Sequence, residues 1–87
     1  MGQRETLTPS PHLAEKGCNA ICNLSYGNDD NITRLGEAGA CATIVEVMTI
    51  HKTVAIVAKK ACNAICNLSY GDDDNIIRLG EAEACAI

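Results

Sequence analysis

The chain has 87 residues, a formal net charge of −4 and a hydrophobic fraction of 47%, yet it contains no Phe, no Trp and only two Tyr. A chain of this length forms at most one small domain with a modest core. Its negative charge argues against a general phosphate-binding surface, so we expect no nucleic-acid partner. No apolar run approaches the roughly 20 residues that a membrane-spanning helix needs, and the N-terminus lacks the basic-then-apolar pattern of a signal peptide.

The first element in chain order is a helix that is expected to start at Ser10. Serine is a favoured helix cap and Pro11 suits the first helical position, so this pair is a strong start signal. Residues 1–9 show no hydrophobic periodicity, which predicts a disordered leader. The leader begins with MGQRET, which fits the weak motif for N-myristoylation of Gly2.

A short helix is predicted next, at about Asp30–Ala38. Asp29 and Asp30 are expected to supply capping oxygens and a favourable negative charge at its positive end, and Gly39 the left-handed residue that ends it. A second acidic run, DDD at residues 72–74, stands at the matching place later in the chain. These aspartates either cap and solubilise the short helix or select basic ligands.

Two further helices are predicted before Gly71. One covers about Ala40–Thr49, where the apolar residues recur at helical spacing on one face. The other is the longest, at about Thr53–Tyr70, and its apolar residues follow the i, i+3, i+4, i+7 spacing almost without a break. Both patterns are typical of amphipathic helices that bury one face.

The sequence repeats itself: residues 16–43 match residues 60–87 at a shift of 44, with 23 of 28 positions identical. A period of 44 excludes ankyrin and tetratricopeptide units of about 33–34 residues and fits the roughly 40–47 of armadillo and HEAT arrays. We therefore predict one complete three-helix repeat at 28–71, flanked by the third helix of a partial repeat at 10–27 and by the truncated start of a further repeat at 72–87. Since arrays need several stacked units to bury their core, the isolated chain is expected to self-associate.

The stretches DDNIIRLGEA, EAGACATIVEVM and ACNAICNLSYG resemble the armadillo repeat of importin-α- and β-catenin-like proteins. The resemblance covers about residues 10–87 and implies an all-α, right-handed α-solenoid of the armadillo type. The sequence departs from the family pattern at three kinds of position: Ala42 stands where the family often has proline, Glu83 replaces a turn glycine, and Asn19 and Asn63 stand where peptide-binding members often carry tryptophan. HEAT repeats are the nearest structural alternative.

The resemblance also implies a function, because the long third helices of such arrays line a concave groove that binds an extended peptide of a partner protein. Asn23 and Asn67 match the family asparagine that holds the ligand backbone, and an amide can donate and accept at once. The candidate groove residues are Asn19, Asn23, Tyr26, Lys59, Asn63, Asn67 and Tyr70. The alternative is that these residues are simply solvated and that the chain is a structural spacer of a larger, HEAT-like scaffold.

The six cysteines fall at apolar positions of predicted helices, and we expect them to be small buried side chains in a reducing compartment, the cytoplasm or the nucleus. They are Cys18, Cys22, Cys41, Cys62, Cys66 and Cys85. Each Cys-x-x-x-Cys pair offers two sulfurs, whereas a structural zinc site needs four ligands, and a disulfide between residues i and i+4 of a helix has poor geometry. The chain has neither a paired histidine and base nor a phosphate-binding glycine loop, so we expect no metal, no cofactor and no enzymatic activity.

Overall fold

Every regular element in the described part of the chain, residues 10–86 of a computed structural model, is helical. The elements are α2 (Pro11–Ser25), α3 (Asp29–Glu37), α4 (Ala40–Ile50), α5 (Ala55–Ser69), α6 (Asp73–Glu81) and the 3₁₀ turn η1 (Ala84–Ala86). No strand occurs among these residues, so the prediction of an all-α protein is confirmed. None of the helices between residues 10 and 86 has the length and apolarity that a membrane crossing requires. The predicted leader at 1–9, with its Gly2 motif, lies outside the described residues.

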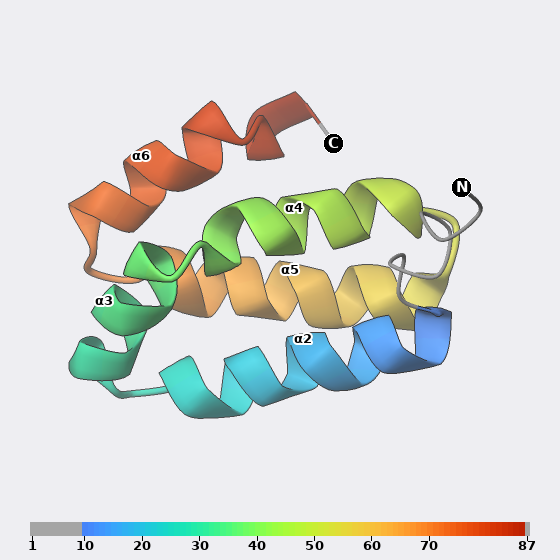
Figure 1. Ribbon diagram of the computed structural model, residues 1–87, viewed down its shortest axis with the longest axis horizontal. Helices are drawn as coiled ribbons and strands as arrows, with labels where there is room; N and C mark the ends of the chain where they lie inside the picture. The colour runs from blue at the N-terminus through green and yellow to red at the C-terminus, as the bar shows by residue number, and fades with distance from the viewer. Residues whose placement is uncertain (1–9, 87) are drawn as a thin grey trace, which may run out of the picture.

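The two longest helices, α2 and α5, lie side by side and run in the same direction (Figure 1). Helix α4 lies along α5 and runs the opposite way, and α6 lies beyond α4. The short helix α3 joins the end of α2 to the start of α4 and also contacts α5 and α6. Because α2 and α5 carry the two copies of CNAICNLSYG, this parallel packing places equivalent residues of the repeat beside each other.

The predicted start of the first helix is confirmed, because the Ser10 side chain accepts a hydrogen bond from the backbone N–H of Leu13 at 3.2 Å. The predicted cap of the next helix is wrong. Asn28, not Asp29 or Asp30, caps α3 and accepts from the backbone at 2.9 Å. A capping residue needs extended dihedral angles just before the first turn, whereas both aspartates lie inside that turn, where they contribute only favourable charge.

Asp72 caps α6 at the position that Asn28 occupies before α3. Its Oδ1 accepts from the Asn75 N–H at 2.9 Å, and its Oδ2 accepts from the Thr33 hydroxyl of α3 at 3.0 Å. The backbone hydrogen bond from Asn75 is the main cause that lowers the pKa of Asp72, and the Thr33 hydroxyl and the Arg78 guanidinium act in the same direction. This carboxylate therefore joins the two short helices while it caps one of them.

Two turns that follow the short helices need a residue in the left-handed region. In the first, Gly39 has φ +92°, as predicted from its place after the helix. In the second, Glu83 stands at the equivalent position and has φ +68°, the one positive φ of a non-glycine residue in the described chain. A side chain in this conformation costs about 1–2 kcal/mol because its Cβ crowds the following carbonyl oxygen.

Replacing Glu83 by glycine is therefore expected to stabilise the fold by about 0.5–1 kcal/mol, since the strain it removes exceeds the extra backbone entropy that glycine loses on folding. Urea-induced unfolding, followed by circular dichroism, measures the change. Glu83→Ala is the matched control, because it removes the same charge and keeps the strain. Equal gains from both substitutions would mean that charge, and not backbone conformation, limits stability here.

The core lies around α5, which is covered by α2 on one side and α4 on another. Four residues of α5 have no exposed surface, and Cys41 and Ile44 of α4 are each 1% exposed. The four are Val57, Ala61, Ala64 and Leu68. Two of them are alanines, and small side chains let neighbouring helices approach closely.

The two copies of the repeated helix bury different faces. We call the row of residues that α2 buries the forward face, and the row that α5 buries the rear face. The forward face consists of Ala14, Cys18, Cys22 and Ser25 on α2 and of the equivalent Ala58, Cys62, Cys66 and Ser69 on α5. The rear face consists of Leu13, Gly17, Ala20 and Leu24 on α2 and of the equivalent Val57, Ala61, Ala64 and Leu68 on α5. Residues of the rear face are fully buried on α5 and exposed on α2, whereas the forward face is mostly buried on α2 and largely open on α5.

A buried asparagine fixes the position of α6. Asn75 is fully buried, and its Nδ2 donates to the carbonyl oxygens of Ile32 in α3 at 3.0 Å and of Leu68 in α5 at 2.9 Å. Its Oδ1 accepts from Arg78 at 2.7 Å. Gly36 of α3 lies against this amide, and a Cβ there would overlap the Asn75 oxygen. Its local sequence, DDNI, is the same as that of the half-buried Asn31, so the sequence did not predict this buried position.

Candidate functional site

Six of the seven candidate groove residues line two adjoining pockets between the C-terminal halves of α2 and α5. One pocket, of about 450 Å³, is lined by Tyr26, Asn67 and Tyr70 together with residues of the turn after α2 and Ile32 of α3. The other pocket, of about 350 Å³, is lined by four asparagines together with Cys22, Cys66 and Tyr26. The asparagines are Asn19, Asn23, Asn63 and Asn67. The seventh candidate, Lys59, is exposed but lines neither pocket.

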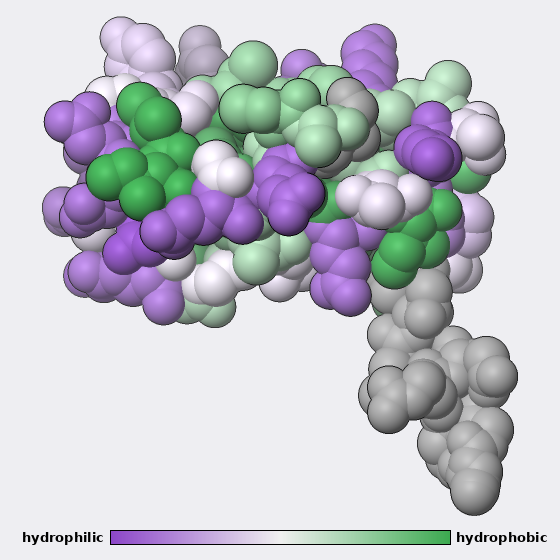
Figure 2. Space-filling view, turned by 90° about the horizontal axis from the view of Figure 1, so that it is seen from above, coloured by the Kyte–Doolittle hydropathy of each residue, from purple (hydrophilic) through white to green (hydrophobic). Residues whose placement is uncertain are grey.

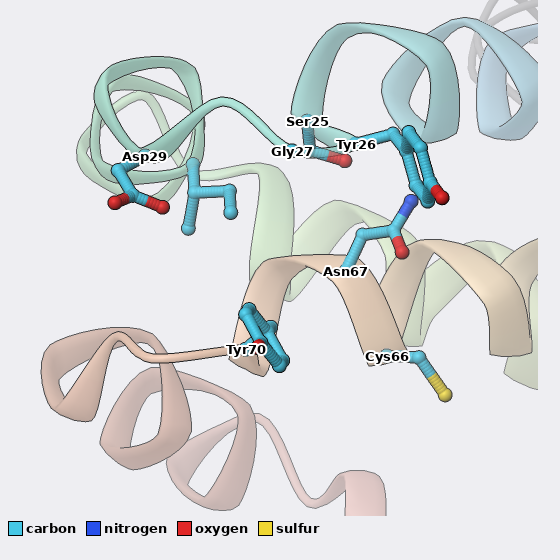
Figure 3. A pocket seen from close by; sticks show the side chains of 8 residues that line it. Ser25, Tyr26, Gly27, Asp29, Cys66, Asn67 and Tyr70 are labelled. Atoms are coloured by element: carbon cyan, nitrogen blue, oxygen red, sulfur yellow. The ribbon is translucent and has the colours of Figure 1, made fainter.

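The two tyrosines are the most exposed large side chains of this surface, at 79% for Tyr26 and 77% for Tyr70. Each is the C-cap of its helix and has extended dihedral angles, so its ring leaves the helix direction. Figure 3 shows the Tyr26 ring beside the amide of Asn67. Asp29 stands at the rim of the same pocket and is exposed. A ring with a hydroxyl offers apolar area and a hydrogen bond to a ligand at once.

Asn67 already makes one hydrogen bond within the protein. Its Nδ2 donates to the carbonyl oxygen of Cys22 at 3.1 Å, and in Figure 3 the amide nitrogen points toward α2. The Cys22 thiol in turn lies 3.5 Å from the Lys60 carbonyl oxygen. An amide has two N–H donors and a carbonyl acceptor, so the bond to Cys22 leaves one N–H and Oδ1 for a ligand.

The other asparagines occupy equivalent positions on the two parallel helices. Asn19 and Asn63 form one such pair and Asn23 and Asn67 the next, one helical turn further along. Asn23 and Asn63 are exposed, whereas Asn19 and Asn67 are half-buried. The surface therefore carries two pairs of amides at regular spacing, flanked by the tyrosine of each helix.

The cysteines differ in exposure, so the expectation that all six are buried is wrong for three of them. Cys18 and Cys41 are buried and Cys22 is half-buried, and burial raises the pKa of each of these thiols. Cys62, Cys66 and Cys85 are exposed. The difference between the two copies comes from packing. Helix α5 packs against the side of α2 that carries Cys18 and Cys22, whereas Cys62 and Cys66 lie on a side of α5 that is largely open.

In solution dilute enough to keep the chain monomeric, a thiol-reactive reagent is expected to modify the three exposed cysteines rapidly and Cys18 and Cys41 slowly, because the buried thiols are both shielded and less ionised. Mass spectrometry of peptides after timed modification gives the rate at each cysteine. Full denaturation is the control, since it should equalise the six rates. Rapid modification of Cys18 in the folded protein would contradict the packing of α2 against α5.

The described residues contain no group of three or more His, Cys, Asp or Glu side chains placed to hold a metal ion. Compared with family models, with curated proteins and with solved structures, the chain shows no significant match. The chemistry that this surface offers is that of its own residues, which are two exposed tyrosines, four asparagines and an aspartate at the rim.

Proposed function

We propose that the chain is part of an armadillo-type solenoid and that the surface shared by α2 and α5 binds an extended peptide segment of a partner protein. In this proposal α2 and α5 are the long third helices of successive repeats. The 44-residue repeat supports it, as does the parallel packing of the two helices that carry the repeated sequence. Consecutive repeats then present the same side chains at regular steps along one surface.

The observation that carries the proposal is the exposure of Tyr26 and Tyr70 beside amides that retain hydrogen-bonding capacity. Packed helices lie about 8–10 Å apart, and an extended peptide advances about 3.3 Å per residue. Asn23 and Asn67 are therefore spaced to contact peptide backbone about three residues apart. The tyrosine rings would then pack on the peptide side chains between these points.

The composition of the site also limits the class of peptide. Asn19 and Asn63 lack the indole face on which the aliphatic stems of lysine and arginine pack. Basic peptides of the nuclear-import type are therefore not expected to bind strongly, even though Asp29 stands at the rim. Peptides with apolar or aromatic side chains match the tyrosines better.

A specific observation favours the second candidate, a structural spacer. The hydrogen bond from Asn67 to the Cys22 carbonyl joins neighbouring helices, so this asparagine has a role in packing without any ligand. If every asparagine of the repeat serves in this way, the surface needs no partner. Asn63 discriminates between the peptide-binding surface and the spacer, because it lies on the same surface and is exposed. Its replacement should reduce peptide affinity only if the surface binds a peptide.

Selection from a library of random peptides of about 12 residues, long enough to cross two helices at about 3.3 Å per residue, tests the proposal. Selected peptides are expected to bind the native chain and to lose affinity for Tyr70→Ala and for Asn63→Ala. Ile50→Ala, which removes an exposed apolar side chain at the end of α4, is the control. Failure to select any binder, or equal losses in all three variants, would leave the spacer as the better account.

A further inference from the structure

The interface between α2 and α5 is formed by two copies of nearly the same helix, and each copy keeps its other face open. On α2 the rear face is uncovered, with Leu13 61% and Leu24 53% exposed, although the equivalent residues of α5 are fully buried. On α5 the forward face is uncovered at Cys62 and Cys66, although Cys18 of α2 is 2% exposed. The two open faces therefore carry nearly the same residues as the two faces that are buried inside the molecule.

We propose that a second copy of this chain stacks head to tail on the first, with the rear face of its α2 on the forward face of α5. The occupant follows from the internal interface, since α2 of a second copy differs from α5 on this face only at Leu13, which replaces Val57, and at Gly17, which replaces Ala61. This association needs the stacking geometry of the repeat and does not need a peptide ligand.

The short helices α3 and α6 also have equivalent residues that could make the same contacts between two copies of the chain. In the internal interface Asn75 of α6 donates to the Ile32 carbonyl oxygen and lies against Gly36. The Nδ2 of the equivalent Asn31 donates to the carbonyl oxygen of Leu24 at 2.8 Å, and Asn31 is only half-buried. In the stacked pair, Asn31 of the second copy meets the carbonyl of Ile76 and lies against Gly80 of the first. Gly80 leaves the required space, since no atom would lie within 4 Å of a Cβ there.

The exposed apolar residues of α6 belong to the same open end. Ile76 is 51% and Ile77 57% exposed, whereas Ile32, the equivalent of Ile76, is 3% exposed in α3. Figure 2, which views the molecule from the α6 side, shows apolar side chains gathered at the end where α6 begins. Stacking covers Ile76 as the internal interface covers Ile32.

Because the two surfaces that meet are different, the contact is heterologous. Such contacts do not close on themselves after two copies and generate open chains unless a ring forms. We therefore expect a concentration-dependent series of oligomers, measured in reducing buffer by sedimentation velocity, and not a single dimer.

Two glycine substitutions form a matched pair that tests the geometry. Gly80→Ala and Gly17→Ala each place a methyl group at an exposed helical glycine where it meets nothing in the single chain. Gly80→Ala is expected to weaken association by about tenfold or more, the factor that a typical overpacking cost gives, because the methyl would overlap Asn31 of the second copy. Gly17→Ala is expected to associate at least as well as the native chain, because alanine already stands at position 61. Unchanged association of Gly80→Ala would overturn the proposal.

A mixing experiment tests the polarity of the contact. Leu24→Glu blocks the rear face and Gly80→Ala weakens the forward end, so each variant alone is expected to be mostly monomeric at a concentration at which the native chain associates. Mixed together they are expected to form a 1:1 dimer and nothing larger, because one intact face of each remains. Ala20→Glu is a second rear-face variant, and circular dichroism confirms that each variant is folded. A mixture that stays monomeric, or a folded variant that forms long oligomers by itself, would contradict head-to-tail stacking.

Discussion

Replacing Asn75 by alanine is expected to destabilise the fold by about 3 kcal/mol. The substitution removes two hydrogen bonds to buried carbonyl oxygens, those of Ile32 and Leu68, and one from Arg78. A buried polar group that loses its partner costs about 1–3 kcal/mol, and the fully buried amide also leaves a cavity. Because a small domain has only about 5–15 kcal/mol of stability, the effect is large. Urea-induced unfolding measures it.

Asn31→Ala is the internal control, since Asn31 stands at the position equivalent to Asn75 in the other copy of the repeat. It makes one side-chain hydrogen bond, to the Leu24 carbonyl oxygen, and is only half-buried. Its loss is expected to cost about 1 kcal/mol, close to the net contribution of one hydrogen bond. Equal losses from the two substitutions would show that α6 does not depend on the buried amide.

The second large effect is expected on the affinity for a selected peptide. If the surface of α2 and α5 holds a peptide as proposed, each of its asparagines can exchange two hydrogen bonds with water for two with the peptide backbone, at a net gain of about 0.5–1.5 kcal/mol per bond. Asn23→Ala is therefore expected to cost about 1–3 kcal/mol, or roughly 5- to 150-fold in Kd. The double variant Asn23→Ala/Asn67→Ala is expected to abolish measurable binding of a micromolar peptide. Fluorescence anisotropy of a labelled peptide gives both values.

Asn31→Ala serves again as the control, because it changes an asparagine outside both pockets. Asn67→Ala also removes the hydrogen bond to the Cys22 carbonyl oxygen. The free energy of unfolding of this variant therefore has to be measured as well as its affinity for the peptide. Asn23 is exposed and gives the cleaner comparison. Equal, small losses for Asn23→Ala and Asn31→Ala would mean that this surface does not hold the peptide backbone.

Local signals in the sequence were sufficient to predict the helices and their turns. The periodicity of apolar residues, the Ser10–Pro11 start and the turn glycine at position 39 each act within a few residues, and the structure contains the helices close to the predicted positions. The internal repeat also identified the two helices that are copies of each other, α2 and α5. The cap of α3 was misassigned because Asn28, Asp29 and Asp30 are all good capping residues, and only the backbone angles distinguish them.

Exposure could not be predicted in the same way, because identical residues have different surroundings in the two copies. Cys18 and Cys62 stand in the same local sequence, yet one is buried and the other exposed, since only the first has a helix packed against it. Asn31 and Asn75 differ for the same reason. The bond from Asn67 to the Cys22 carbonyl also joins residues that are far apart in the chain, so no local signal could reveal it.

A titration of the ¹⁵N-labelled chain with a selected peptide, followed by amide chemical shifts, tests peptide binding on the surface of α2 and α5 most directly. The Gly80→Ala variant suits this measurement, since its substitution lies outside both pockets and is expected to weaken the proposed self-association. Saturable shifts are expected at Tyr26, Asn63 and Tyr70 and their neighbours, with α4 unchanged. Shifts confined to α4 and α6, or no saturable shift at all, would contradict the proposed function.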